Sequence, residues 1–297
     1  MLRPVVVGLD GSAESLAAAD WAAAEALGRG LPLRLLHAGE GLSSRPSHLP
    51  ELDAPRRRAH AILQVASRQL AEKYPLLHTT AGEVARPPVD ALVEAGSEAE
   101  FLVLGSRAFS GVGGLLAGSV AMSAVARVPR PVVLVRAART TEGAPRPAPD
   151  GANASGASHP VVVGVDLAHS CEEVVAFAFE NAALRSVPLH VVHSRRPTHT
   201  HERDTPATGA EATSQSSAER ALADLLAPWR ERHPKVVVRS EVSRGSPVQL
   251  LLHACADADL LVLGRRIRPA LLGPHIGRVT HAMIHEVPCP VAVVPHG

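Results

Sequence analysis

A glycine-rich stretch from Gly105 to Val120, reading GSRAFSGVGGLLAGSV, directly follows the apolar run FLVL. Glycine lets backbone amides approach an anion closely and adopts backbone angles that other residues avoid. When such a stretch joins a buried strand to a helix, its N–H groups and the helix N-terminus can donate to a phosphate. Gly118 and Ser119 stand where the helix should begin, so the Ser119 hydroxyl can donate as well. The pattern favours a phosphate site, and a flexible solvent loop is the alternative.

Two common nucleotide motifs do not fit this stretch. The P-loop needs a lysine after its last glycine, and no lysine follows any of these glycines. The dinucleotide fingerprint fails because Leu116 stands at the third glycine position after Gly111 and Gly113. The tripeptide HIG at His275 begins like the HIGH signature of class I synthetases, but Arg278 follows it late in the chain.

The chain contains the same pattern twice. PVVVGLD at Pro4 returns as PVVVGVD at Pro160, 156 positions later (160 − 4 = 156), and VPRPVVLV returns as VPCPVAVV after 159 positions (287 − 128 = 159). Nearly constant offsets indicate two copies of one fold, with insertions confined to loops. We expect one domain over residues 1–138, a Pro/Gly/Ala-rich linker over 139–158 and a second domain over 159–297.

Strands and helices alternate within each copy. In the first, periodicity predicts strands over 5–9, 33–38, 77–84, 101–104 and 132–135, and helices over 12–29, 55–74, 89–96 and 119–128. Such alternation requires parallel pairing through right-handed crossovers, so each copy predicts an α/β fold with a doubly wound, five-stranded parallel sheet. Asp10 and Ser12 can cap the first helix. Ligands bind beyond the carboxyl ends of such strands, so Asp10 and Gly105 belong at one crevice if their strands are neighbours.

The glycine spacing resembles the nucleotide signature of tandem universal stress proteins. That signature is Gly, two residues, Gly, nine residues, Gly, then Ser or Thr. Here it starts at Gly105, has Ala108 in place of the second glycine, and ends nine residues later at Gly118 and Ser119. The resemblance covers both halves outside the linker. It implies an adenine-nucleotide α-hydrolase-like fold and a regulatory role in a bacterial stress response.

The resemblance also implies a ligand and its site. The ligand is ATP, alone or with Mg²⁺, with Asp10 near the adenosine end and the backbone of Ala38 facing the adenine. Matched position by position, the binding residues are Gly8, Leu9, Asp10, Ala38, Leu104, Gly105, Arg107, Ala108, Gly118, Ser119 and Val120. No catalytic residue and no metal ligand is expected. The alternatives are a slow ATPase or phosphoryl-transfer enzyme, and a scaffold whose nucleotide sites are vestigial.

The second copy departs from the signature. It keeps Asp166 and Gly264, but Ile267 stands at the second glycine position and Arg278 replaces the Ser or Thr. A β-branched residue avoids positive φ, so this loop cannot follow the same path if the family loop needs that conformation. We expect the second site to be degenerate, with the Arg278 side chain filling it.

Composition excludes several partners. A formal net charge of +1 and 2% aromatic residues argue against nucleic acid. The apolar run at the N-terminus is too short to cross a membrane. The three cysteines are far apart in the sequence and form no CxxC pair, so we expect buried thiols in a reduced, cytoplasmic protein. His281 and His285 have metal-ligand spacing but no evident third ligand, so we expect them on a helix surface.

The last strand of each copy suggests how the halves assemble. Each is short, apolar and preceded by proline, and an unpaired apolar edge invites pairing. The family typically joins two such strands across a two-fold axis. The resemblance therefore implies that the two halves pair within the chain through their last strands, and it leaves a homodimer open.

Overall fold

The computed structural model describes residues 2–39, 54–106, 119–137, 159–195, 209–267 and 275–297. The chain divides into two compact units, Met1–Gly151 and Ala152–Gly297, which are called the first and second unit below. The predicted linker over 139–158 lies outside the described residues, and pairing of the two halves through their last strands stays a prediction.

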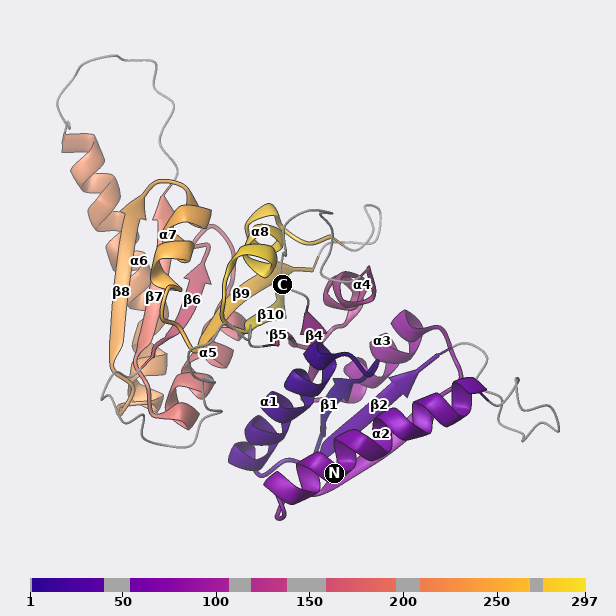
Figure 1. Ribbon diagram of the computed structural model, residues 1–297. Coiled ribbons are helices and arrows are strands. Elements are labelled where there is room, and N and C mark those ends of the chain that lie inside the picture. Colours follow the sequence, from indigo (N-terminus) through magenta and orange to yellow (C-terminus); the bar gives the residue numbers. More distant parts are fainter. Residues whose placement is uncertain (1, 40–53, 107–118, 138–158, 196–208, 268–274) are drawn as a thin grey trace. The chain divides into compact units, whose positions relative to one another are not determined.

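The first unit is a five-stranded parallel sheet with helices on both faces (Figure 1). Its strands lie in the order β3-β2-β1-β4-β5, and every neighbouring pair is parallel. Its elements are β1 (Val5–Gly8), α1 (Ala13–Arg29), β2 (Leu33–Ala38), α2 (Ala54–Lys73), β3 (Thr79–Val84), α3 (Pro88–Glu98), β4 (Phe101–Ser106), α4 (Ser119–Arg127) and β5 (Val132–Arg136). Strand order reverses between β1 and β4, which confirms both the doubly wound fold and the adjacency of these strands.

The second unit repeats this architecture in the order β10-β9-β6-β7-β8, again all parallel. Its elements are β6 (Val161–Val165), α5 (Glu172–Arg185), β7 (Leu189–Arg195), α6 (Gly209–Arg232), β8 (Val238–Arg244), α7 (Pro247–Ala254), β9 (Leu260–Arg266), α8 (Arg278–Glu286) and β10 (Val291–His296). Gly164 pairs with Leu263 as Gly8 pairs with Leu104, so both units place the same two strand ends side by side.

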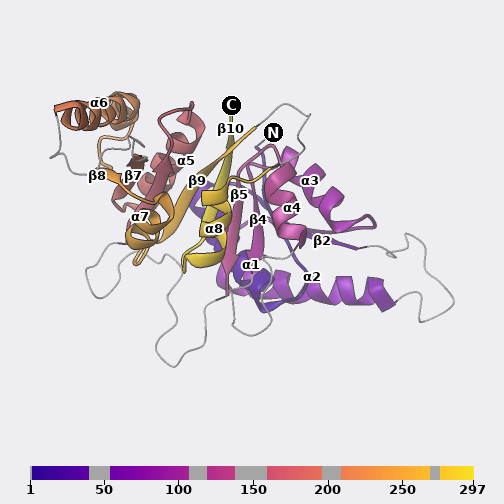
Figure 2. The same cartoon turned by 90° about the horizontal axis from the view of Figure 1, so that it is seen from above.

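Aliphatic strands form the core of each unit. Val5, Val6 and Val7 are fully buried, as expected for a strand covered on both faces. In the first unit, α1 and α2 cover one face and α3 and α4 the other, as the view in Figure 2 shows. In the second unit, α5 and α6 lie on one face and α7 and α8 on the other. Each sheet is thereby covered by helices on both faces.

One predicted strand begins later than expected. The apolar pattern predicts a strand from Leu77, but β3 begins at Thr79. The Leu77 N–H donates to the Tyr74 carbonyl at 3.0 Å, which closes a turn after α2 and keeps Leu77 out of the sheet. Hydrophobicity alone does not distinguish these two conformations.

Candidate functional site

In the first unit, two glycines bring the ends of β1 and β4 close to their neighbours. A Cβ on Gly8 would lie 2.7 Å from Leu104 Cδ2 and 2.9 Å from Leu92 Cδ2. A Cβ on Gly105 would lie 2.6 Å from backbone atoms of both Glu14 and Ser15 in the first turn of α1. Backbone cannot move aside as a side-chain tip can, so Gly105 is required for β4 to end against this helix.

Asp10 is exposed at the end of β1, and its carboxylate is held by the start of α1. The Ser12 N–H and the Ser12 hydroxyl donate to Asp10 Oδ1 at 2.9 and 2.6 Å. Ser12 is the N-cap of α1, and its Oγ accepts a hydrogen bond from the Ser15 N–H at 3.2 Å. Gly11 between them has φ +86°, a left-handed angle that favours glycine. The prediction that Asp10 and Ser12 cap this helix is confirmed.

His37 fixes the backbone just before Asp10. Its Nδ1 lies 2.7 Å from the Leu9 carbonyl oxygen, and the Leu9 N–H donates to the Leu36 carbonyl at 2.8 Å. His193 does the same in the second unit, where its Nδ1 lies 3.0 Å from the Val165 carbonyl oxygen. Sequence reasoning missed this pair, although both histidines occupy the same position in the repeat (193 − 37 = 156). The repeated contact indicates a structural role at the strand end.

Ser106 closes β4 beside Gly105. Its side chain is buried, and its hydroxyl has no hydrogen-bond partner within the part of the chain that the structure describes. At the matching place of the second unit stands Arg265 (265 − 106 = 159), also buried, and burial lowers the pKa of its guanidinium. A small hydroxyl in one unit is thus replaced by a long cation in the other.

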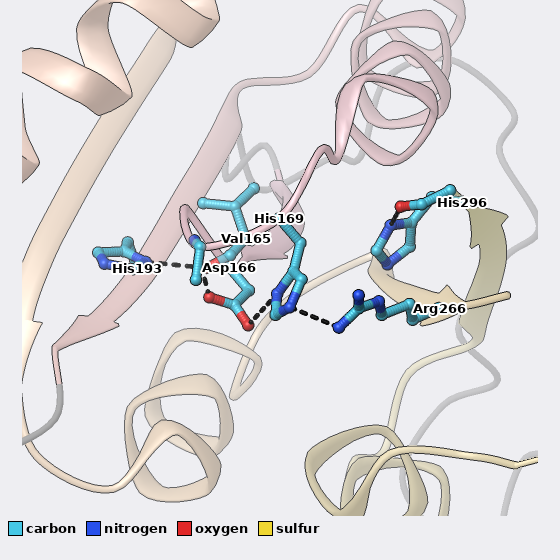
Figure 3. Close-up of polar contacts among 8 residues, drawn as sticks. Val165, Asp166, His169, His193, Arg266 and His296 are labelled. Carbon is cyan, nitrogen blue, oxygen red and sulfur yellow. Dashed lines mark hydrogen bonds and ion pairs between the residues drawn. The ribbon is translucent and has the colours of Figure 1, made fainter. Parts of the chain in front are cut away.

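The second unit binds its own aspartate differently (Figure 3). Asp166 Oδ1 accepts from the Ala168 N–H at 3.1 Å, and Oδ2 lies 3.1 Å from His169 Nδ1. His169 Nε2 lies 2.7 Å from Arg266 Nη1. Because a guanidinium only donates, Nε2 accepts and the ring proton sits on Nδ1, facing the carboxylate. Asp166, His169 and Arg266 form what is called the Asp166 chain below.

Opposing effects act on the Asp166 carboxyl. Burial raises its pKa, but the hydrogen bonds from Ala168 and His169 favour the carboxylate and outweigh burial. The pKa of Asp166 therefore lies below its ordinary value. The carboxylate is stabilised by groups of its own unit.

Around Gly264, side chains of the second unit fill the strand end. A Cβ on Gly264 would lie 2.7 Å from His296 Nε2, and the Thr280 hydroxyl donates to the Gly264 carbonyl at 3.1 Å. The Ile267 N–H donates to the His296 carbonyl at 2.8 Å, so Ile267 continues the extended course of β9. Arg278 is exposed at the start of α8, as Ser119 is at the start of α4. Residues 268–274 lie outside the described residues, so the filling of this site by Arg278 stays a prediction. The residues that engage Asp166 lie elsewhere in the sequence.

The sequence as a whole matches one family model twice. The model of the universal stress protein family matches residues 1–136 and 158–295. The chain belongs to the universal stress protein family.

Known universal stress proteins resemble the whole chain. Universal stress protein Rv2005c of Mycobacterium tuberculosis is 34% identical over 303 residues, covering 97% of this chain and 96% of the relative. A crystal structure of a universal stress protein from Archaeoglobus fulgidus covers 99% of this chain and 98% of that chain, with a TM-score of 0.69 at 17% identity, and shows the shared fold. A universal stress protein solved in complex with cAMP is 31% identical, covers 46% of this chain and 98% of that chain, and has a TM-score of 0.36.

The predicted nucleotide residues of this universal stress protein fall into three groups. Gly8, Leu9, Asp10, Ala38, Leu104 and Gly105 lie at or just after the carboxyl ends of β1, β2 and β4, on one edge of the first sheet. Ser119 and Val120 begin α4. Arg107, Ala108 and Gly118 lie outside the described residues. The course of the glycine-rich stretch therefore stays a prediction.

Other side chains that could do chemistry are held in packing roles. The His281 and His285 rings lie 4.7 Å apart, and no cluster of three or more His, Cys, Asp or Glu that could hold a metal occurs in the described ranges. All three cysteines are buried and unpaired by disulfides. Burial raises the pKa of Cys171 to about 11, and a hydrogen bond with Cys289 together with burial raises that of Cys255. No helix within the ranges described has the length and hydropathy that a membrane crossing needs.

Proposed function

We propose that this universal stress protein binds one molecule of ATP per chain, in its first unit, and serves as a nucleotide-dependent regulator in a stress response. The observation that carries the proposal is the position of the signature. Its first glycine, Gly105, is the penultimate residue of β4, next to the residue that pairs with the end of β1, and its last serine, Ser119, begins α4. Ligands of doubly wound sheets bind at such a reversal of strand order.

The residues at this edge suit a nucleotide. The exposed Asp10 carboxylate can accept from the ribose hydroxyls. The N-terminus of α4 and the Ser119 hydroxyl supply donors and partial positive charge for phosphate oxygens. These residues are not arranged to accelerate a reaction of bound ATP. We therefore propose that the site binds ATP without turning it over rapidly.

The contacts of Asp166 in the second unit support a stoichiometry of one ATP per chain. Its aspartate is already bonded to His169, which contacts Arg266, so a ribose hydroxyl would have to displace a charge-assisted contact. Its α8 begins with Arg278 where α4 begins with Ser119. We propose that the second unit contributes packing rather than a second ATP site.

Calorimetric titration of ATP into the full chain tests this function. Ser119→Arg places the residue of the second unit at the start of α4. We expect it to weaken ATP binding at least about tenfold, because a long side chain replaces the short hydroxyl and crowds the phosphates. The matched control is Arg278→Ser, which should leave binding unchanged. Absence of saturable binding to the unmodified chain would instead support a scaffold with vestigial sites.

Two further measurements separate the remaining alternatives. Phosphate release should be far slower than a typical enzyme turnover of about 10 per second, and release near that rate would support a phosphoryl-transfer enzyme. ATP should bind more tightly than AMP, because the N-terminus of α4 would contact the terminal phosphates. Equal affinities would show that binding depends on the adenosine end alone.

A further inference from the structure

A cavity of about 440 Å³ lies at the outer edge of the first sheet, between α2 and the edge strand β3. None of the predicted nucleotide residues lines it. Its lining includes Arg56, His60, Gln64 and Arg68 from α2 and Ala81, Gly82 and Glu83 from β3. A Cβ on the intervening Gly82 would point to the opposite face of the sheet and meet nothing within 4 Å.

The hydrogen-bond register shows which backbone groups of β3 face this edge. The Leu33 N–H donates to the His78 carbonyl at 2.9 Å, and the Gly39 N–H donates to the Val84 carbonyl at 3.1 Å. Even-numbered residues of β3 therefore face β2. Because successive residues of a strand alternate, the N–H and C=O groups of Ala81 and Glu83 face away from the sheet. These are the groups that an added strand would bond.

The side chains above this edge are mainly cationic. Arg56, His60, Gln64 and Arg68 follow one another at four-residue intervals, which places them on one face of α2 over three turns. Two guanidinium groups and an imidazole stand against one carboxylate, that of Glu83, whose Oε1 lies 3.8 Å from His60 Nδ1. The groove is complementary to a negatively charged chain.

The second unit closes its corresponding edge with its own side chain. There the Leu189 N–H donates to the Val237 carbonyl, so Val242 faces away from the sheet, and its carbonyl accepts from Gln215 Nε2 at 2.9 Å. Gln215 also bonds Arg195 and Glu219. Arg56 stands at the matching place in the first unit (215 − 159 = 56), where no described side chain bonds the Glu83 carbonyl. Among the residues that the structure describes, one edge is guarded, as edge strands commonly are, and the other is not.

We propose that β3 accepts an extended acidic peptide segment of a partner protein as an additional strand. The peptide backbone bonds Ala81 and Glu83, and its acidic side chains pair with Arg56 and Arg68. These arginines are separated by about 18 Å along the helix, since a helix rises about 1.5 Å per residue. A strand covers that span in about six residues at about 3.3 Å each, so two acidic residues about six positions apart match both arginines.

Fluorescence anisotropy with a defined peptide tests the proposal on the full chain. The probe is a labelled, acetylated heptapeptide, Glu-Val-Thr-Val-Thr-Val-Glu, and its control has lysine at both ends. Ala81→Pro removes one outward N–H without touching the bonds to β2, and should reduce binding at least about tenfold. The matched control Ser240→Pro makes the same change on the guarded edge of the second unit (240 − 81 = 159) and should have no effect.

A second variant keeps the test independent of any folding defect of the proline variant. Arg56→Gln introduces at this position the glutamine that bonds the edge strand in the second unit. It should weaken binding of the acidic peptide and leave the circular dichroism spectrum of the protein unchanged. Bound peptide should also slow amide hydrogen exchange at Ala81 and Glu83, but not at Gly82, which already faces β2. This pattern is specific to an added strand.

Three outcomes would overturn the proposal. Equal binding of the acidic and lysine peptides would remove the charge argument. Peptide binding that inorganic phosphate abolishes but Ala81→Pro does not would indicate a small-anion site. Self-association of the chain that Ala81→Pro prevents, without peptide binding, would make a second copy the occupant. None of these results depends on whether the first unit binds ATP.

Discussion

The two units end their first strands in the same way and then use the aspartate differently. In the first unit, Asp10 bonds Ser12, the residue that caps α1. In the second, Ala168 has no hydroxyl to offer, and Asp166 bonds His169 instead, three positions further along. The N-cap of α5, Cys171, makes no side-chain cap hydrogen bond. Three residues that differ after the strand therefore decide whether the exposed carboxylate bonds the helix N-cap, as Asp10 does, or a histidine, as Asp166 does.

The proposed function places a nucleotide site in the first unit and none in the second, and this contrast is the structural difference on which that proposal rests. The sheets and the strand register are the same, because buried valines and leucines specify them. The sites differ in a few polar residues at the strand ends. Since exposed and half-buried polar residues contribute little to folding, they can change while the architecture persists.

The largest expected effect comes from filling the glycine position at the end of β4. Gly105→Ala places a methyl group against the backbone of Glu14 and Ser15 and should lower the free energy of unfolding by about 1–3 kcal/mol. Gly264→Ala meets the His296 ring, which can turn aside near the C-terminus, and should cost less than about 1 kcal/mol. Urea unfolding measures both, with Gly82→Ala in open space as the control. Equal losses in all three would contradict the packing argument.

Helix capping should give the next largest difference. Ser12→Ala removes the side chain that accepts from Ser15 and bonds Asp10, and should cost about 1 kcal/mol of stability. Ala168→Ser, the reciprocal change in the second unit, should cause no loss. Thermal unfolding monitored by circular dichroism compares the two variants. A loss of stability in Ala168→Ser, but not in Ser12→Ala, would show that the roles of these two positions are reversed.

A smaller, pH-dependent effect should come from Asp166. Its native pKa is depressed, so its carboxylate stabilises the fold above the ordinary carboxyl pKa, and that contribution disappears as pH falls through the native value. The Asp166 side chain is 63% exposed, so Asp166→Asn should cost less than about 1 kcal/mol at pH 7. The difference in the free energy of unfolding between Asp166→Asn and the unmodified protein, measured by urea titration, should disappear between about pH 5 and 3. If this difference in the free energy of unfolding instead grew as the pH fell, His169 would not favour the ionised Asp166 carboxylate.

The smallest effect concerns thiol reactivity, which can only report on the second unit because Cys171, Cys255 and Cys289 all lie there. Burial and the raised pKa keep Cys171 protonated at pH 8, so iodoacetamide should label the native protein negligibly within an hour. Urea should make all three thiols reactive. Rapid labelling of Cys171 in the native state would show that the second unit opens readily at α5.

Local and periodic features of the fold could be predicted from the sequence. The repeats, the alternation of strands and helices, and the capping role of Asp10 and Ser12 depend on residues close together in the chain. The contact of His37 with the Leu9 carbonyl and that of Arg266 with His169 join residues far apart in sequence. They depend on the register between strands, which a single sequence does not specify. The role of Arg278 in the second site stays a prediction, because residues 268–274 of the same stretch lie outside the described ranges.

Counting nucleotides on the intact chain tests the central claim most directly. Native mass spectrometry in the presence of ATP should show a single bound nucleotide per chain, which Ser119→Arg removes and Arg278→Ser leaves in place. This result would place the ligand in the first unit and keep the second silent. Two equivalents bound with similar affinity, or one that survives Ser119→Arg and depends on the second unit, would contradict the account.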